Sequence, residues 1–324
     1  MDRDARLMSA SPNCSKTLAG VDIGTLTCRL LIAEWSPAGH LRELQSERRI
    51  LLLGQGVDGE RRLRADAMER VIATLKEWRQ VIDHYQVEDS TVVATSAVRD
   101  AANRDEFFNR VKREAGFDVE MISGEEEARR TMLGIRSGLP PGVTDMLALD
   151  IGGGSIEFIL DQVRKPPIVR SIDVGVVRLS ERILRHDPPR SHEIQQAREW
   201  VQKETYAAVA GMSRPPGLAF VGTAGTITSL AAMTQELSTY EPARIHNYTL
   251  TLDMVRGLEE RLLSRSKSQR AGMPGLESGR EEVIAAGAII LRTVMETLDV
   301  ISVLVSDLGL REGVLIDLAN RMRQ

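Results

Sequence analysis

The chain has 324 residues, of which 42% are hydrophobic and 27% are charged, as expected of a globular protein large enough for two cores. Its formal net charge of −4 does not attract polyanions overall, so non-specific nucleic-acid binding is not expected. The only cysteines, Cys14 and Cys28, indicate neither a disulfide framework nor a cysteine metal site, which favours a reducing, cytoplasmic location.

The beginning of the sequence predicts a flexible leader over residues 1–16. This segment mixes charged side chains with Ser, Pro and Asn, and it lacks the apolar core of a signal peptide. Elsewhere no run approaches the roughly 18 apolar residues of a membrane span. The stretch 283–294, for example, is interrupted by Gly287. The protein is therefore not expected to be embedded in a membrane.

The first predicted elements form a βαβ pattern. Residues 18–35 are apolar and β-rich on both sides of the turn 24–27, which predicts a hairpin. Apolar residues then recur at helical spacing from Met68 to Ile82. A strand over 91–95, a polar turn through Arg99 and Asn103, a helix through Phe107 and Val111, and a strand ending at Ile122 follow. This order is typical of an α/β fold.

The second half of the chain repeats the opening hairpin. Asp150-Ile151-Gly152 aligns with Asp22-Ile23-Gly24, and each Asp is followed five positions later by a hydroxyl residue, Ser155 or Thr27. In this alignment Arg29 takes the position of Glu157. We therefore predict two related domains. Later come a strand and glycine turn at 220–226, a helix from about 281 to 298, a strand over 300–305 and a closing helix.

The turn after Asp150 predicts a phosphate-binding hairpin. A Walker loop would require a Lys and a following helix, whereas residues 156–160 alternate like a strand. We expect Gly152, Gly153 and Gly154 to allow positive φ and a close approach of an oxyanion, with Ser155 as a hydroxyl donor. A plain glycine-rich turn is the alternative. The related turn after Asp22 argues against it.

Acidic residues beside these turns are candidate metal ligands and catalysts. Asp150 and Glu157 flank the second turn and are spaced to hold Mg²⁺, although Glu157 could also be a solvated strand residue. In 123–128, Ser123 and Glu126 form a capping-box pattern, and Glu125 suits the start of a helix. Spacing alone does not select a catalyst among the glutamates of this segment.

Two further motifs are weaker. The turn Gly222-Thr223-Ala224-Gly225-Thr226 could bind a phosphate or a ribose, but Gly/Thr turns also serve close packing. The pair His186-Asp187 resembles the metal pair of HD hydrolases only as a dipeptide, because no matching His and Asp array surrounds it. We predict a loop there.

Together these motifs resemble the exopolyphosphatase/guanosine pentaphosphate phosphohydrolase family, within the actin, sugar kinase and chaperone ATPase superfamily. The resemblance covers nearly the whole chain, and the segments that carry it are 22–24, 94–100, 122–128, 150–157, 175–179, 222–229 and 306–313. It implies an α/β fold of two ribonuclease H-like domains with a cleft between them. Domain I would comprise 17–125 and 307–324, and domain II would comprise 126–306 with helical additions.

The resemblance also implies roles for individual residues. Glu127 would be the catalytic carboxylate, with Asp22, Asp150 and Glu157 at Mg²⁺ or another divalent cation. The phosphate-binding residues would be Gly24, Thr25, Thr27, Arg29, Arg99, Gly152, Gly153, Gly154, Ser155, Gly222, Thr223, Gly225 and Thr226. One departure concerns the first turn, where the family usually has Gly-Ser-Asn-Ser and this chain has Gly24-Thr25-Leu26-Thr27. Leu26 removes an amide, which affects phosphate contacts and substrate preference.

These residues predict a metal-dependent phosphohydrolase. It would release terminal phosphate from polyphosphate or convert pppGpp to ppGpp, with Glu127 orienting water. A helix N-terminus would lower the pKa of Glu127 unless burial counteracts it. The alternatives are an ATP-dependent kinase or ATPase of the same fold and a non-catalytic regulator that binds polyphosphate or pppGpp. The family likeness also suggests a homodimer.

Overall fold

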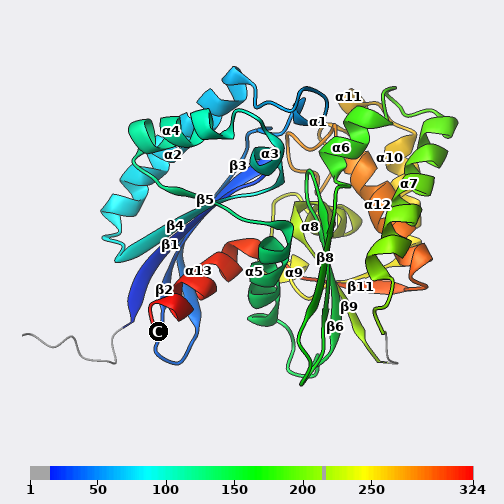
Figure 1. The fold of residues 1–324 in the computed structure, drawn as a ribbon. Helices are drawn as coiled ribbons and strands as arrows, with labels where there is room; N and C mark the ends of the chain where they lie inside the picture. Colours follow the sequence, from blue (N-terminus) through cyan, green and yellow to red (C-terminus); the bar gives the residue numbers. More distant parts are fainter. Residues whose placement is uncertain (1–14, 214–216, 324) are drawn as a thin grey trace, which may run out of the picture.

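The computed structural model describes residues 15–213 and 217–323 and contains two β-sheets that lie side by side, each covered by helices (Figure 1). Residues 1–14 of the predicted leader lie outside the described residues, and the first strand begins at Lys16, the last residue of the leader range. Within the described ranges, no helix is both long and apolar enough to cross a membrane.

The first sheet has five strands in the order β3-β2-β1-β4-β5. They are β1 (Lys16–Ile23), β2 (Thr27–Trp35), β3 (Leu41–Ile50), β4 (Asp89–Ala94) and β5 (Val119–Met121). The predicted hairpin is β1 with β2, which pair antiparallel, and β4 and β5 extend the sheet in parallel. The hydrophobic pattern did not predict β3, because this edge strand is half-buried and rich in charged residues.

The second sheet repeats this arrangement and has the order β10-β11-β9-β6-β7-β8. Its strands are β6 (Met146–Ile151), β7 (Ile156–Asp161), β8 (Ile168–Ile172), β9 (Ala219–Thr223), β10 (Thr249–Thr251) and β11 (Ser302–Val305). The hairpin β6–β7 corresponds to β1–β2, with β8 beside it like β3 and with β9 and β11 in parallel like β4 and β5. Only β10, an antiparallel edge strand, breaks the correspondence.

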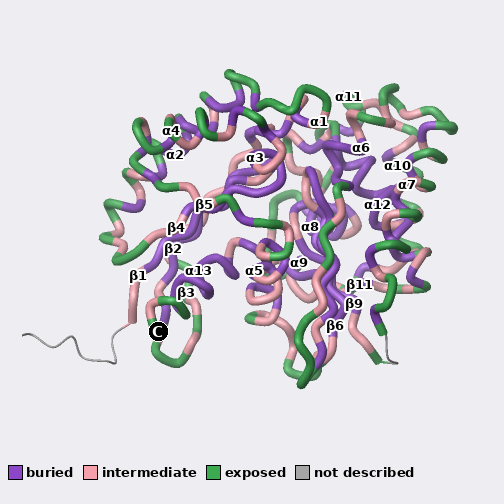
Figure 2. The backbone as a smooth tube through the Cα atoms, in the orientation of Figure 1, coloured by how far each residue is buried: buried purple, intermediate pink, exposed green. Residues whose placement is uncertain are grey.

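Helices on the outer faces build the two largest cores. Against the first sheet lie α2 (Ala65–His84) and α4 (Arg104–Ala115), and against the second lie α6 (Val176–Arg182), α7 (Ser191–Val209), α8 (Ala224–Thr234), α10 (Leu252–Leu263) and α12 (Ile284–Thr297). The short helices are α1 (Val57–Glu60), α3 (Ser96–Asp100), α9 (Pro242–Ile245) and α11 (Lys267–Arg270). Figure 2 shows the buried backbone along the strands and the inward helix faces.

Two inner helices, α5 (Gly124–Arg136) and α13 (Leu310–Arg321), pack between the sheets and against each other (Figure 1). The closing helix α13 lies on β1, β2 and β4, whereas α5 lies on β6, β7 and β8. Their contact is so close that a Cβ added at Gly313 would be 1.7 Å from the carbonyl oxygen of Arg130. We call the first sheet with α1–α4 and α13 the first lobe, and the remainder with α5 the second.

Three local predictions need correction or remain open. The polar turn predicted through Arg99 is instead the short helix α3. The helix predicted from about 281 begins at Ile284, after a turn that ends at Val283. Because α5 begins at Gly124 and runs across the predicted boundary at 125/126, the exact domain limits stay a prediction.

Candidate active site

The two hairpins have turns of the same construction that face each other between the lobes. In each turn the first glycine donates its N–H to the carbonyl of the hydroxyl residue, from Gly24 to Thr27 and from Gly152 to Ser155, both at 3.0 Å. The strand register places Asp22 opposite Arg29, and Asp150 opposite Glu157. The sequence alignment therefore predicted the paired positions correctly.

The tips of the two turns touch. A Cβ added at Gly153 would lie 2.8 Å from the Cβ of Thr25, and one at Gly154 would lie 2.2 Å from the hydroxyl of Ser96. None of the glycines 152–154 has a positive φ, so that expectation is wrong. Glycine is required here because a side chain would force the first lobe away.

A cavity of about 80 Å³, which we call the hairpin pocket, lies between the turns. Of the predicted site residues, it is lined by Asp22, Gly24, Thr25, Thr27, Arg29, Glu127, Asp150, Gly152, Gly153, Gly154, Ser155, Gly225 and Thr226. Thr95, Ser96, Leu26 and Arg280 also line it. The tertiary structure thus brings together most of the predicted phosphate-binding groups.

Among the three glutamates at the start of α5, Glu127 is the one that reaches this pocket. Ser123 caps the helix by accepting a hydrogen bond from the N–H of Glu126 at 3.1 Å, which is the predicted first half of the capping box. The carboxylate of Glu126 instead pairs with Arg129 and Arg130. Glu125 is exposed. The helical repeat therefore turns Glu127 alone toward the hairpins.

Burial dominates the electrostatics of Glu127. Its side chain is 11% exposed, and this burial, reinforced by the nearby negative charge of Glu157, raises the pKa well above its ordinary value. The expected lowering by the helix N-terminus is overcome, because desolvation disfavours the charged form more strongly. Arg99 opposes the rise by donating to Glu127 at 3.3 Å. Arg99 also donates to the carbonyl of Ile122 at 2.8 Å, so it lies behind the glutamate and not on the pocket wall.

The remaining carboxylates are buried and incompletely paired. Desolvation raises the pKa of Asp22 and of Asp150 to about 6, and that of Glu157 to about 8. Glu157 lies beneath the pocket lining, where its Oε1 accepts a hydrogen bond from Ser171 at 2.8 Å. Among the described residues, one oxygen of Asp22 and one of Glu157 have no hydrogen-bond partner. Such buried acids favour a nearby cation.

These groups can supply only part of the coordination shell of a magnesium ion. In the part of the chain that the structure describes, no group of three or more His, Cys, Asp or Glu side chains is arranged as a ready metal site. Mg²⁺ commonly uses one or two carboxylates and completes its shell with water and substrate phosphate. The unpaired oxygens of Asp22 and Glu157 suit that mode.

Arg280 is a pocket residue that the sequence did not reveal. Its side chain is 3% exposed, its Nε donates to Glu277 at 2.8 Å, and its Nη2 has no partner in the part of the chain that the structure describes. A Cβ added at Gly225 would lie 2.2 Å from that nitrogen, which brings the guanidinium to the third turn. A buried guanidinium that keeps a free N–H donor in a pocket favours an oxyanion. No local motif marks Arg280, which follows a turn more than fifty residues after Gly225.

The third turn contributes only its second half to the pocket. Gly222 is packed against Ile227 and Val303, and the hydroxyl of Thr223 donates to the carbonyl of Leu308 at 2.9 Å. Neither residue lines the pocket. Ala224 follows with a positive φ of 71°, a conformation that costs energy for a residue with a side chain. This bend presents Gly225 and Thr226 to the pocket.

A buried arginine of the second lobe ties the second hairpin to the first lobe. Arg178 on α6 donates to the carbonyl of Gly154 at 3.0 Å, to Asp58 at 2.8 Å and to Asp100 at 2.7 Å. Asp100 ends the helix α3 that carries Arg99. Arg178 thus links the turn of the second hairpin to α3, the helix of the first lobe whose Arg99 contacts Glu127.

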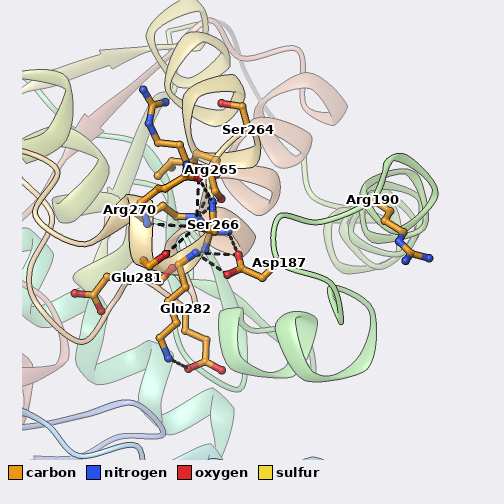
Figure 3. A network of polar contacts seen from close by, with 12 residues as sticks. Asp187, Arg190, Ser264, Arg265, Ser266, Arg270, Glu281 and Glu282 are labelled. Carbon is orange, nitrogen blue, oxygen red and sulfur yellow. Dashed lines mark hydrogen bonds and ion pairs between the residues drawn. The ribbon is translucent and has the colours of Figure 1, made fainter.

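The His186-Asp187 pair lies in a loop, as predicted. Figure 3 shows Asp187 at the start of α11, where it accepts hydrogen bonds from the backbone N–H of Lys267 and from Arg270. His186 contacts Glu193 at 2.8 Å. Both side chains therefore support the fold of this region, away from the hairpin pocket.

Two sheets of one strand order, with matched turns across a cleft, define the two-lobed class of actin-like, ribonuclease H-like α/β folds. The crystal structure of the Aquifex aeolicus member of the Ppx/GppA family is 34% identical, with a TM-score of 0.81, and covers 96% of this chain and 100% of its own. An exopolyphosphatase structure from Cytophaga hutchinsonii is 27% identical, with a TM-score of 0.86 and coverages of 94% and 98%.

Sequence comparison agrees with the structural comparison. Exopolyphosphatase 2 of Mycobacterium tuberculosis is 33% identical over 319 residues, which cover 93% of this chain and 98% of that protein. The model of the Ppx/GppA phosphatase family matches residues 32–322. The chain belongs to the Ppx/GppA phosphatase family.

Proposed function

We propose that this protein is a metal-dependent phosphohydrolase that releases the terminal phosphate of inorganic polyphosphate. The observation that carries the proposal is the hairpin pocket, in which two facing turns surround Glu127 and buried, partly unpaired carboxylates. Relatives named exopolyphosphatase that align over nearly the whole chain support the same reaction and substrate.

Glu127 has the environment of a group that orients and deprotonates water. Its raised pKa makes it a stronger proton acceptor than an exposed glutamate, and Arg99 fixes one of its oxygens. Phosphoryl transfer requires little covalent chemistry from the protein, so alignment of water and terminal phosphate accounts for most of the catalysis. Backbone N–H groups of the turns and the unpaired nitrogen of Arg280 would hold the phosphoryl oxygens.

Asp22, Asp150 and Glu157 would hold the divalent cation, one or two of them directly and the others through water. When bound, Mg²⁺ would offset negative charge on the phosphate oxygens as a Lewis acid. Without a cation, the carboxylates of the site would repel the negatively charged substrate. Ser155 and Ser171 orient Glu157, and Thr131 donates to Asp150 at 3.4 Å.

Three finer parts of the proposal rest on the family likeness. The same site would convert pppGpp to ppGpp, the protein would act in the cytoplasm, and it would form a homodimer.

Leu26 no longer gives a specific reason to prefer a non-catalytic regulator. Its side chain is 5% exposed and belongs to the main core cluster of the second lobe, so it has a packing role of its own.

Phosphate release from long polyphosphate, tripolyphosphate, pppGpp and ATP, with and without Mg²⁺, tests the proposal. Release from polyphosphate without ATP separates a hydrolase from a kinase, and binding without turnover indicates a regulator. Glu127→Gln should lower kcat by roughly 100-fold to 10,000-fold while preserving substrate affinity, because it removes the base and keeps the shape. Glu125→Gln, on the exposed face of the same helix, is the control. Wild-type turnover by Glu127→Gln would refute its role.

A further inference from the structure

A second cavity opens next to the hairpin pocket. It has a volume of about 340 Å³, and Arg29 and Ala224 belong to the walls of both cavities. Another neighbouring cavity, on the side of Ser96 and Arg178, has a volume of about 20 Å³. A linear substrate with its end in the hairpin pocket therefore finds room for its next linked units in the larger cavity.

Arginine and hydroxyl side chains from both lobes dominate the wall of this larger cavity, which we call the arginine pocket. They are Arg29, Ser46, Arg48, Thr228, Tyr240 and Arg311. Two carboxylates, Glu43 and Asp307, also line it, but Glu43 pairs with Arg311 at 3.8 Å and Asp307 accepts a hydrogen bond from Tyr240. The cavity thus offers many hydrogen-bond donors at the boundary between the lobes.

The register of the first sheet places two of these arginines directly opposite each other. Arg29 on β2 is the cross-strand partner of Arg48 on β3. Like charges in such a pair destabilise a sheet unless something compensates them. Arg48 pairs with Glu277 at 2.9 Å, whereas Arg29 has no hydrogen-bond or ion-pair partner among the described residues. Its charge lies near the carboxylates of Asp22 and Asp150, where it counteracts the rise of their pKa, and its side chain lines both cavities.

The third arginine completes the wall from α13. The side chain of Arg311 is 17% exposed, and its Nη1 donates to Ser46 while its Nη2 pairs with Glu312. The side chain of Arg48 is 25% exposed, and its guanidinium lies 4.5 Å from the centre of the Tyr240 ring. Half-buried guanidiniums held in this way bind phosphate oxygens more strongly than freely solvated ones.

We propose that the arginine pocket binds the linked phosphates that follow the terminal one in the substrate, with Arg48 and Arg311 as their ligands. This inference rests on the proposed function, because it assigns the leaving part of the same substrate to a second subsite. The shared ligand chemistry is a chain of phosphoanhydride-linked phosphates, which an inorganic polyphosphate or a nucleoside triphosphate can supply.

The test compares a short and a long anion. In the Glu127→Gln background with Mg²⁺ present, Arg311→Gln should weaken tripolyphosphate binding about tenfold in calorimetry, because one charge-assisted hydrogen bond is lost. Binding of orthophosphate, which fills only the hairpin pocket, should stay within about twofold. Arg49→Gln is the matched control, since this neighbour on β3 pairs with Glu47 and Glu77 and does not line the cavity.

Arg48→Gln provides a second, independent variant. Glu277 joins Arg48 to Arg280, so this variant also reveals whether an effect passes through the hairpin pocket. If Arg311→Gln and Arg48→Gln bind tripolyphosphate like Arg49→Gln, the subsite does not exist. An equal loss of orthophosphate binding also overturns it, because the arginines would then act on the terminal phosphate.

GTP as a further probe identifies the source of the phosphates. A loss with tripolyphosphate alone assigns the subsite to inorganic chains, and a loss with both assigns it to linked phosphates of either origin. A loss with GTP alone overturns the proposal, since the nucleoside would then occupy the cavity. If wild-type protein binds tripolyphosphate but never releases phosphate, the proposed function fails while the binding measurements still decide the subsite.

Discussion

The β1–β2 and β6–β7 hairpins share register and turn geometry, yet they present different groups to the pocket between them. Opposite its strand-end aspartate, the first hairpin has Arg29 and the second has Glu157. At the tip, the first has Leu26, buried in the core of the other lobe, and the second has glycines that touch the first lobe. The same hairpin backbone thus serves two purposes. The first hairpin contributes a positive charge and is anchored by Leu26 in the second lobe, whereas the second contributes a carboxylate and lets the first lobe approach its glycines closely.

The largest expected effect comes from removing the acid that distinguishes the second hairpin. Glu157→Gln should lower kcat on the order of 1,000-fold, because losing the proposed metal carboxylate forfeits several kcal/mol of charge stabilisation. Steady-state phosphate release across a Mg²⁺ titration measures this. Arg29→Gln should instead raise KM about tenfold, since it removes a substrate contact. The assigned division between the hairpins is wrong if both variants change KM alone.

The link between the second hairpin and the first lobe should be the next most sensitive feature. Arg178→Met should lower the free energy of unfolding by about 3 kcal/mol, because it leaves the half-buried carboxylates of Asp58 and Asp100 without this buried partner. Urea unfolding measures the change. Arg182→Gln is the control, because Arg182 pairs with the same Asp58 from a side chain that is 46% exposed. Its cost should be below about 1 kcal/mol. Equal effects would contradict a special role for Arg178.

Substitutions at the tip of the first hairpin should change the free energy of unfolding more than the catalytic rate. Leu26→Asn restores the amide usual in the family but removes an apolar side chain from the second lobe's core and buries a polar group. We expect a loss of about 2 kcal/mol, read as a lower midpoint in urea. Leu26→Met conserves volume and should cost less than about 1.5 kcal/mol. An unchanged midpoint for Leu26→Asn would show that the leucine does not anchor the hairpin.

The last prediction concerns pH in metal-free protein. Burial raises the pKa of Glu157 from 4.5 to about 8, so between these values the native state keeps a proton that the unfolded chain has released. Stability in EDTA should therefore fall as pH rises from about 5 to about 8. Glu157→Gln should flatten the upper part of this fall, and Asp22→Asn the lower part, because the pKa of Asp22 is raised only to about 6. Melting temperatures against pH measure this. The same slope above about pH 6 in Glu157→Gln and wild type would contradict the assignment.

The sequence by itself determined the hairpins, their duplication and the pairing of Asp150 with Glu157. These features depend on residues a few positions apart, because strand alternation and turn chemistry act locally. The same local reasoning predicted positive φ for the glycines and, unless burial counteracted the helix N-terminus, a lowered pKa for Glu127. The glycine prediction failed because the distant first lobe packs against the glycine tips, whereas burial around Glu127 is the exception that the pKa prediction allowed for.

Only the tertiary structure decided which groups meet. Arg280 enters the pocket beside Gly225, Arg99 reaches behind Glu127, and Arg178 joins Gly154 to Asp100, although their partners are 24 to 78 residues away or on another lobe. No local pattern encodes such contacts, since some form when distant segments of the second lobe fold together and others when α5 and α13 pack the two sheets together. Desolvation in the resulting cleft then shifts the pKa of each acid. This desolvation depends on how the two lobes pack, so the sequence alone does not reveal it.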